Sequence, residues 1–488
     1  MKKTICAILL ILGPTLYHTV QAQEVLTLED CRALAKEHSK LLQIKEEGIK
    51  SAHYTRKAAF TKFLPHISAS GSYLRSEKEI SLLSNDKKEA LGSLGAASKA
   101  KIDQVAEAVG VGLPQLKPVL QSLGETAYVG LNQFSDALID GLRTDTRNIY
   151  VGAISLTQPL YMGGKIRAYN QITKHAEQLA KEAHQMELRD VILSVDEAYW
   201  QVVSLKNKEK IAISYKALLE KIDEDIQHYI EEGLATKADG LTIRVKVNEA
   251  DMTLLKVQDG LTLSKMLLAQ ICGIELNTNL VLADESISNL PTKEYQVNID
   301  LNEAYSNRPE IRSLELATQI YSQKIKIARS ELLPQLALMG NYLATNPSSF
   351  NGFENKFRGM WSVGISLKVP IWSWGEGIYK TKAAKADAQI ARLELAEAKE
   401  KIELQISQSA FKVAEANKKL NVALSNMAKA EENLLYAKYG FEEGVIPVSN
   451  VLEAHTAWLS AQSDKIDAQI DIKLTEIYFN KAQGKFTE

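Results

Sequence analysis

The chain has 488 residues, and its 58 basic and 60 acidic side chains leave a formal net charge of −2. This near-neutral balance gives no reason to expect a nucleic acid partner. The length allows roughly three or four domains, so the organisation of the chain must be inferred from its residue patterns.

The N-terminus has the features of a secretory signal peptide. A basic start at Lys2 and Lys3 precedes a short apolar run at 5–12 and a small-residue cleavage site at 20–22. We therefore predict a signal peptide at 1–22. The apolar run is shorter than the roughly 20 residues of a spanning helix, and no other segment approaches that length. If the exported chain enters a membrane, it must do so as β-strands.

One residue pattern occurs twice in the remaining chain. Three segments have distant counterparts: 63–67 with 332–336, 154–160 with 365–371, and 229–233 with 440–444. Such long repeats indicate a duplicated architecture. We predict a first repeat at 23–274, a linker at 275–300 and a second repeat at 301–488. Each repeat contains a helix, two short strands, a very long helix, a tight turn and a return helix.

Two segments in each repeat alternate between apolar and small polar residues, at about 66–75 and 148–159 and at about 335–345 and 361–370. Such alternation suits a sheet between lipid and water, while a half-buried soluble hairpin fits each segment taken alone. Four strands are too few for a spanning barrel, which needs at least about eight and no open edge. Several copies would therefore share one barrel.

Proline and glycine mark the predicted junctions between helices and strands. Proline ends a helical hydrogen-bond ladder and favours extended backbone in its neighbour, and glycine permits a tight return into helix. The junction prolines are Pro65, Pro159, Pro334 and Pro370, and the glycines are Gly164 and Gly375. Aromatic residues at strand ends favour a membrane interface; they are Tyr150, Tyr161, Trp361, Trp372 and Trp374.

The repeats differ most between their strands, where the first carries an insertion at about 76–147. Segments 99–110, 115–124 and 132–142 of this insertion have helical patterns. We expect an ordered extracellular cap if the strand hairpins point outward.

Long helices are predicted at about 165–232 and 376–443, which contain no proline. At 1.5 Å per residue each would extend roughly 100 Å. The second carries alternating large and small residues at heptad spacing, which favours close coiled-coil packing over an ordinary bundle core: Ile406, Val413, Leu420, Met427, Leu434 and Phe441 alternate with Ser409, Ala416, Ala423, Ala430 and Ala437. The first helix starts this seam at Val191, Val195, Ala198, Val202 and Leu205 but loses regularity at Glu209 and Lys216.

The sequence contains no pattern typical of catalysis or of a bound cofactor. Its histidines are scattered without metal spacing, and neither a nucleophile elbow nor a phosphate loop occurs. Cys31 and Cys272 have the pattern of isolated small apolar residues rather than of metal ligands. A disulfide between them in an oxidising periplasm is the alternative. We predict no enzyme, no metal and no cofactor. A non-pore periplasmic coiled-coil adaptor or structural rod is the alternative to a conduit.

The repeat, the proline and glycine junctions and the glycine turns followed by heptad helices together resemble the TolC-like outer membrane efflux proteins. The resemblance covers essentially the whole mature chain. It implies a mainly helical fold: a homotrimer with a long coiled-coil α-helical barrel in the periplasm and a shared transmembrane β-barrel in the outer membrane of a Gram-negative cell. It also implies a passive exit duct, a periplasmic adaptor and an inner-membrane transporter of the RND, ABC or MFS kind.

The resemblance also implies a periplasmic constriction just after the tip turns at Gly233 and Gly444. It places Asp239, Asn450 and Glu453 in the pore lining. Phe441 and Ile446 stand where the family often has a gating tyrosine and a bridging arginine, so this tip is less charged than usual. Phe441 is expected to pack. Helix N-capping is a second, compatible role for Asp239 and Asn450.

Overall fold

The computed structural model describes residues 25–77, 83–142, 147–233, 235–276, 280–286, 297–348, 350 and 354–485. The predicted signal peptide and part of the predicted linker lie outside these residues. The described residues are mainly helical and form two compact units. The helical unit consists of the described residues within Met1–Thr55, Thr173–Ser322 and Ala386–Glu488. The sheet unit consists of the described residues within Arg56–Ile172 and Gln323–Lys385. Each unit contains parts of both predicted repeats.

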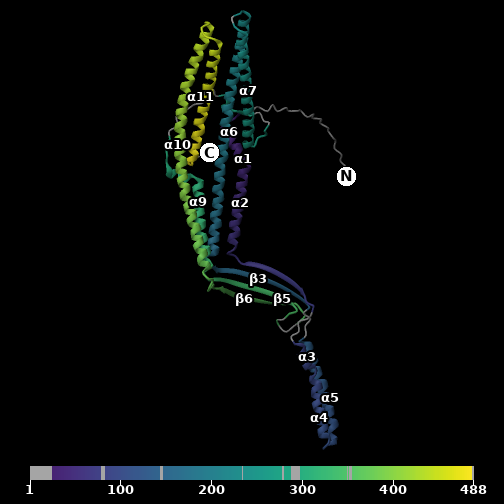
Figure 1. Ribbon diagram of the computed structural model, residues 1–488. Coiled ribbons are helices and arrows are strands. Elements are labelled where there is room, and N and C mark those ends of the chain that lie inside the picture. Colours follow the sequence, from purple (N-terminus) through teal and green to yellow (C-terminus); the bar gives the residue numbers. More distant parts are fainter. Residues whose placement is uncertain are drawn as a thin grey trace, which may run out of the picture. The chain divides into compact units, whose positions relative to one another are not determined.

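Two very long helices dominate the chain (Figure 1). α6 (Lys165–Glu231) and α10 (Glu376–Glu442) contain 67 residues each, and each ends one residue before its predicted end. Among the described helices, none combines the length and apolar character that crossing a bilayer requires. The other elements that contribute to the helical unit are β1 (Val25–Leu26), α1 (Leu28–His38), α2 (Lys40–Thr61), α7 (Lys237–Cys272), β4 (Val281–Leu282), η2 (Ala283–Ser286), α8 (Leu301–Asn307), α9 (Pro309–Ser330) and α11 (Val448–Ala482).

The heptad seam predicted for α10 forms a packed interface. Leu420 and Ala423 pack against Ala468 and Ile472 of α11. Alternation of large and small side chains lets two helices approach closely. The other seam residues of α10 that are buried are Ile406, Val413, Ala416, Met427, Leu434 and Ala437.

The seam of α6 continues past the point where its sequence pattern becomes irregular. Val191, Val195, Ala198 and Val202 are buried as the spacing predicts. Beyond Glu209, Leu219 and Ile226 are buried at the same heptad spacing, and Tyr215 is buried in place of the expected Lys216. These three residues share a cluster with Ile243 and Ala250 of α7, so α6 stays buried although its regular pattern ends.

The sheet unit contains one antiparallel sheet in the order β2-β3-β5-β6. Its strands are β2 (His66–Arg75), β3 (Asn148–Met162), β5 (Gln335–Asn346) and β6 (Arg358–Lys368). All four predicted strands are present, although β3 extends three residues further and β6 begins three residues earlier than expected. Figure 1 shows the four strands side by side in a curved layer.

The cross-strand register sorts the side chains into two faces. Tyr342 lies opposite both Ile154 and Trp361, which places these three residues on one face. We name this the apolar face; it includes Ile67, Tyr73, Tyr150, Ile154, Leu156, Leu336, Leu338, Tyr342, Trp361, Val363, Ile365 and Leu367. The other face is largely small and polar, with His66, Ser68, Ser70, Ser155, Thr157, Asn341, Ser362 and Ser366.

This sheet is unusually exposed for so apolar a surface. Every residue of β2 and β6 is exposed, and Trp361 is 74% exposed. The outer edges of β2 and β6 have no strand partner in the part of the chain that the structure describes. An exposed apolar face and open edges both favour association with other molecules.

Three of the junction prolines lie beside strand ends. Pro65 and Pro334 immediately precede β2 and β5, and Pro370 follows β6. Pro159 corrects the prediction: it lies inside β3, where the register with β5 shifts between Pro159 and Tyr161. A proline lacks the N–H that a ladder needs, and an irregular register accommodates this loss.

The glycine junctions share one backbone conformation. Gly164 and Gly375 have φ values of 83° and 82°, in the left-handed region that favours glycine. The preceding residues, Gly163 and Trp374, are also left-handed, with φ values of 60° and 52°. The two turns into the long helices therefore have the same shape although their sequences differ.

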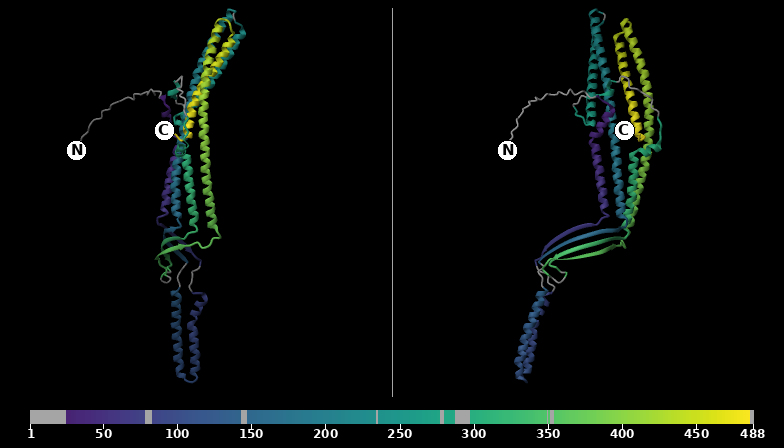
Figure 2. Two further views of the ribbon diagram at one scale, coloured as in Figure 1. Left: turned by 90° about the vertical axis from the view of Figure 1, so that its left-hand side faces the viewer. Right: turned by 180° about the vertical axis from the view of Figure 1, so that it is seen from behind.

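The insertion is helical, as predicted, with different boundaries. It contains α3 (Asn85–Gly92), α4 (Leu94–Gly110), η1 (Pro114–Leu116) and α5 (Lys117–Gly141). α4 and α5 lie side by side, as the left view of Figure 2 shows. The segments 115–124 and 132–142 are not separate helices, because α5 continues through both. A Cβ atom at Gly124 would lie 3.3 Å from Ile102, so this glycine permits close approach of α4 and α5.

Candidate functional site

Two tip turns join the long helices to their return helices. The first tip joins α6 to α7, and the second joins α10 to α11. Gly233 and Gly444 adopt φ values of 75° and 71°. The Ala235 N–H donates to the Tyr229 carbonyl at 3.1 Å, and the Ile446 N–H donates to the Gly440 carbonyl at 3.1 Å. Both bonds satisfy carbonyls that the ends of the long helices leave without a helical partner.

At the first tip, Asp239 belongs to a capping box at the start of α7. Its Oδ2 accepts hydrogen bonds from the Thr236 hydroxyl at 2.6 Å and the Thr236 N–H at 2.9 Å, while its own N–H donates to Thr236 Oγ1 at 3.2 Å. These hydrogen bonds lower the pKa of Asp239 below its ordinary value. Thr236 occupies the N-cap position itself. Asp239 therefore stabilises the helix start and keeps its negative charge at neutral pH.

The second tip has no equivalent polar cap. Pro447 occupies the N-cap position of α11 and supplies no side-chain hydrogen bond. The Asn450 N–H donates to the Pro447 carbonyl at 3.1 Å. Because Pro447 is the N-cap and α11 has no side-chain cap hydrogen bond, the capping role considered for Asn450 is wrong. Asn450 and Glu453 are both exposed on the first turns of α11.

Phe441 packs at the end of α10. It joins one cluster with Tyr215 and Val448 and another with Leu434 and Val451. Its ring centroid lies 6.3 Å from that of Tyr229 on α6. The side chain thus connects the first hairpin to the second within the helical unit.

A buried histidine lies close to Glu453 on α11, and the sequence analysis did not single it out. His455 is 2% exposed, and neither ring nitrogen has a hydrogen-bond partner among the described residues. Burial, followed by the positive charge of Lys438, lowers the pKa of His455 to about 4. The imidazole is therefore neutral at pH 7. The spacing of His455 with Leu452 and Leu459, both at the core, is the signal that indicates its burial.

Two cysteines that are distant in the sequence meet in the core of the helical unit. Cys31 and Cys272 are buried free thiols that belong to one hydrophobic cluster. Cys272 Sγ donates to the Cys31 carbonyl at 3.6 Å. The hydrogen bond with Cys272, and then burial, raise the pKa of the Cys31 thiol.

A partly buried ion pair lies next to this thiol pair and was also missed by the sequence analysis. Arg32 donates from Nε and Nη2 to the two carboxylate oxygens of Asp196 at 2.7 and 2.8 Å. This two-bond geometry is the strong form of such a pair. Among the described residues, no group of three or more His, Cys, Asp or Glu side chains is arranged to hold a metal ion.

The sequence profile of the family described as outer membrane efflux protein matches residues 32–273 and 301–485. These segments include both tips and most of the chain. The protein belongs to the outer membrane efflux protein family. The predicted resemblance is thereby confirmed.

Several individual proteins are similar to this outer membrane efflux protein. The alkaline protease secretion protein AprF of Pseudomonas aeruginosa is 23% identical over 66% of this chain and 67% of its own length. The outer membrane protein TolC of Vibrio cholerae is 23% identical over 69% of this chain and 76% of its own length. The structure of CusC matches with a TM-score of 0.72 over 94% of this chain and 92% of that chain, at 13% identity. The structural match shows a shared fold.

Family membership confirms the predicted location and function. This efflux protein is an outer membrane channel of a Gram-negative cell with its helical part in the periplasm, and it serves as the exit duct of an efflux or secretion system. The family consists of channel proteins and not of enzymes.

Proposed function

We propose that three copies of this chain form one conduit: a shared β-barrel in the outer membrane, continuous with a periplasmic α-helical barrel. The observation that carries this proposal is the four-stranded sheet with an exposed apolar face and two open edges. Lipid would cover the apolar face, and strands of neighbouring copies would cover the edges.

The order of the strands supports closure between copies. Successive neighbours in β2-β3-β5-β6 are antiparallel, so β2 and β6 run in opposite directions. β6 of one copy can therefore pair antiparallel with β2 of the next. Three copies supply twelve strands, which exceeds the minimum of about eight for a spanning barrel.

The helical unit also has an exposed apolar stripe. Leu241, Val245, Met252 and Leu255 follow heptad spacing along α7, and all four are exposed. Exposed stripes of this kind fit knobs-into-holes packing with another helix. We assign this stripe to the contact between copies in the helical barrel.

We further propose that Asp239, Asn450 and Glu453 line the periplasmic constriction. Asp239 is ionised, and Asn450 and Glu453 are exposed near the second tip. An acidic ring in a narrow pore attracts cations, so the duct would have a mild cation preference. Replacing Asp239 and Glu453 by alanine would remove this preference, and an unchanged reversal potential in a salt gradient would contradict the assignment.

The proposed partners are a periplasmic adaptor and an inner-membrane transporter of the RND, ABC or MFS kind. One similar protein is named for alkaline protease secretion, and another is named as the outer membrane protein of a solvent efflux pump. The helical unit offers a surface cavity of about 700 Å³ with apolar residues such as Val422 and charged residues such as Lys419 and Asp467. We propose this cavity as part of the adaptor contact.

Planar-bilayer recording tests the conduit directly. The full-length protein, extracted from outer membranes as an oligomer, would give discrete conductance steps. A membrane-inserted oligomer without conductance would mean that the pore is sealed at rest. A protein that salt alone releases from membranes, without any inserted oligomer, would refute the conduit and favour the periplasmic coiled-coil rod.

A further inference from the structure

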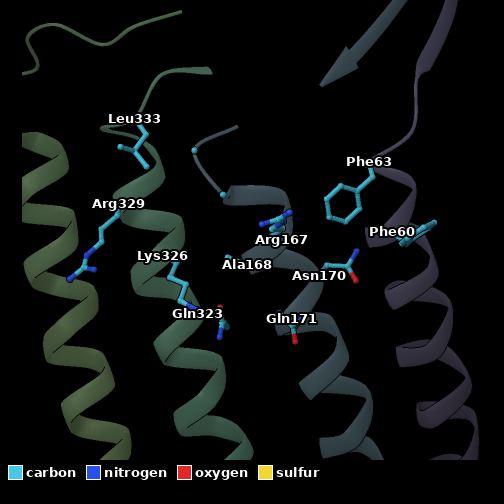
Figure 3. Close-up of a pocket in the computed structure, with 12 residues that line it drawn as sticks. Phe60, Phe63, Arg167, Ala168, Asn170, Gln171, Gln323, Lys326, Arg329 and Leu333 are labelled. Atoms are coloured by element: carbon cyan, nitrogen blue, oxygen red, sulfur yellow. The ribbon is translucent and has the colours of Figure 1, made fainter. Parts of the chain in front are cut away.

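A basic cavity lies in the sheet unit where three helices meet the strands (Figure 3). Its volume is about 650 Å³. The end of α2 contributes Phe60 and the residue Phe63 follows it, the start of α6 contributes Arg167, and the end of α9 contributes Lys326 and Arg329. Leu333 completes its apolar part. We call this the junction cavity.

The three cations of the junction cavity have no ion-pair partner among the described residues. All three side chains are exposed, and the lining residues include no carboxylate. The nearby Glu331 is engaged elsewhere, because it accepts from Lys380 Nζ at 3.0 Å. Lys380 in turn pairs with Glu376 at 2.8 Å. Two carboxylates therefore pair with the neighbouring Lys380, whereas Arg167, Lys326 and Arg329 keep their positive charges available for a ligand.

The cavity is continuous with the apolar face of the sheet. Phe63, Gly164 and Arg167 line both the junction cavity and a smaller depression beside it, and that depression also contains Leu160 and Tyr161. Tyr161 lies opposite Leu336 in the register of β3 and β5, which places it on the apolar face. A ligand bound by the three cations could therefore extend apolar atoms onto the surface that lipid is proposed to cover.

We propose that the junction cavity binds the phosphate of a glycerophospholipid from the periplasmic leaflet of the outer membrane. This inference rests on the proposed function, which places the sheet in the bilayer. Arginine matches phosphate through paired N–H donors, and lysine adds a compact charge. Phe60, Phe63 and Leu333 would contact the glycerol and the first acyl carbons of the lipid. These atoms lie at the membrane interface, where aromatic side chains are favoured.

The position of the exposed tryptophans supports this depth. Trp372 and Trp374 lie between β6 and α10, and their ring centroids are 5.7 Å apart. They belong to the same end of the sheet as Pro65 and Leu333, where strands meet helices. Exposed tryptophan is typical of the headgroup level of a bilayer, so phosphate groups would be available at the cavity.

The experiment uses the full-length protein in detergent. Native mass spectrometry measures retained phospholipid, and titration with phosphatidylglycerol measures its affinity. The test variant is Arg167→Gln with Lys326→Gln and Arg329→Gln, which removes the charges and keeps polar side chains. The matched control, Lys174→Gln with Lys412→Gln and Lys429→Gln, removes three exposed lysines of the helical unit. We expect affinity to fall on the order of a hundredfold in the test variant only.

Two comparisons decide the nature of the ligand. Inorganic phosphate should not replace phosphatidylglycerol, because it lacks the acyl chains that contact the apolar face. Equal binding of inorganic phosphate, lost in the same variant, would show a free-anion site and overturn the lipid assignment. Preferential retention of lipopolysaccharide over phospholipid would also overturn it.

Insertion and conductance separate this inference from the proposed function. If both triple variants insert and conduct as the unmodified protein does while retaining equal phospholipid, the junction cavity is not the lipid site and the conduit stands. If the unmodified protein forms no membrane-inserted oligomer, the proposed function fails first.

Misfolding of the test variant would be recognised by loss of the oligomer. Arg167→Lys with Arg329→Lys would then provide the test, since this double variant keeps the positive charges and removes the paired N–H donors. Phospholipid affinity unchanged in that double variant would contradict the role of arginine.

Discussion

The two tips have the same backbone and are stabilised in different ways. Their glycines share the left-handed conformation, and both turns return an N–H to a carbonyl of the long helix. The first tip then relies on the capping box of Thr236 and Asp239. The second relies on burial, because Val448 and Leu452 of α11 join the core formed by α6 and α7.

At equivalent positions of the two tips, the first is stabilised by local hydrogen bonds and the second by tertiary packing. Pro447 corresponds to Thr236, and Asn450 corresponds to Asp239. The capping box needs only four consecutive residues, so the first tip can hold its shape without contact to the other hairpin. The second tip holds its shape through the hydrophobic contact with the first hairpin. The two tips should therefore respond to different substitutions and to different pH ranges.

The largest expected effect is the loss of the buried leucine of the second tip. Leu452 is 4% exposed, whereas the corresponding Leu241 of α7 is 63% exposed. Leu452→Ala should lower the free energy of local opening of α11 by about 3 kcal/mol, because it leaves a cavity in a packed core. Native-state hydrogen exchange of α11 amides measures this change.

Leu241→Ala is the matched control. It should leave the exchange of α7 and α11 nearly unchanged and instead weaken the association of copies, which chromatography of the detergent-extracted oligomer would detect. Equal exchange effects of the two substitutions would contradict the difference between the tips.

The second prediction concerns pH. His455 has a pKa of about 4 in the folded chain and about 6.5 when unfolded. The unfolded chain therefore binds a proton first, and stability is lost as pH falls from about 6.5 to about 4, by up to about 3 kcal/mol. The lowered pKa of Asp239 implies that the first tip loses its cap only below the ordinary carboxylate pKa. The two tips therefore weaken in different pH windows.

Thermal unfolding of the extracted protein at pH 7 and at pH 4.5 tests this difference. His455→Leu should reduce the loss of stability at the lower pH, because it removes the group that protonates. Arg244 occupies the corresponding place on α7 and is exposed, so Arg244→Leu should keep the full pH dependence. The same pH dependence in all three proteins would show that other groups control the acid response.

The third prediction removes the polar cap of the first tip. Thr236→Ala deletes the hydroxyl that accepts from the Asp239 N–H and donates to its carboxylate. The helix start should lose about 1 kcal/mol, and hydrogen exchange should rise in the first turn of α7 alone. Thr242→Ala changes another threonine on the same helix, whose hydroxyl donates to Ala238, and should leave this first turn protected. An equal rise at the second tip would mean that the two tips are coupled.

The sequence predicted the elements of this fold because their signals are local. Heptad spacing in α10 and alternation in β6 each lie within one segment, and glycine marks the left-handed turns at Gly164 and Gly233. Pro159 was misplaced because a shift of register depends on the partner strand β5. Trp374 was not recognised as left-handed for a similar reason, since its residue type does not favour that conformation.

The candidate site was less predictable because it depends on contacts between distant segments. Asp239 belongs to a capping box whose residue spacing is visible in the sequence, yet the assignment of Thr236 as the N-cap needed its side-chain geometry. The ring of His455 lies 6.4 Å from that of Tyr215, centroid to centroid, and Tyr215 belongs to another helix. The junction cavity combines Arg167 with Arg329, and only the fold brings these residues to one surface.

The smallest expected effect comes from moving the capping box to the second tip. Pro447 has φ −72° and ψ 157°, close to the φ −95° and ψ 157° of Thr236. Pro447→Thr with Asn450→Asp should therefore form the same hydrogen bonds. The gain of about 1 kcal/mol from the cap is partly offset by the lost rigidity of proline, which leaves about 0.5 kcal/mol. Pro447→Val with Asn450→Asp has the same shape without the hydroxyl and is the matched control. Hydrogen exchange in the first turn of α11 should slow only in the threonine variant, because the valine variant lacks the hydroxyl oxygen that would accept from the backbone N–H at position 450.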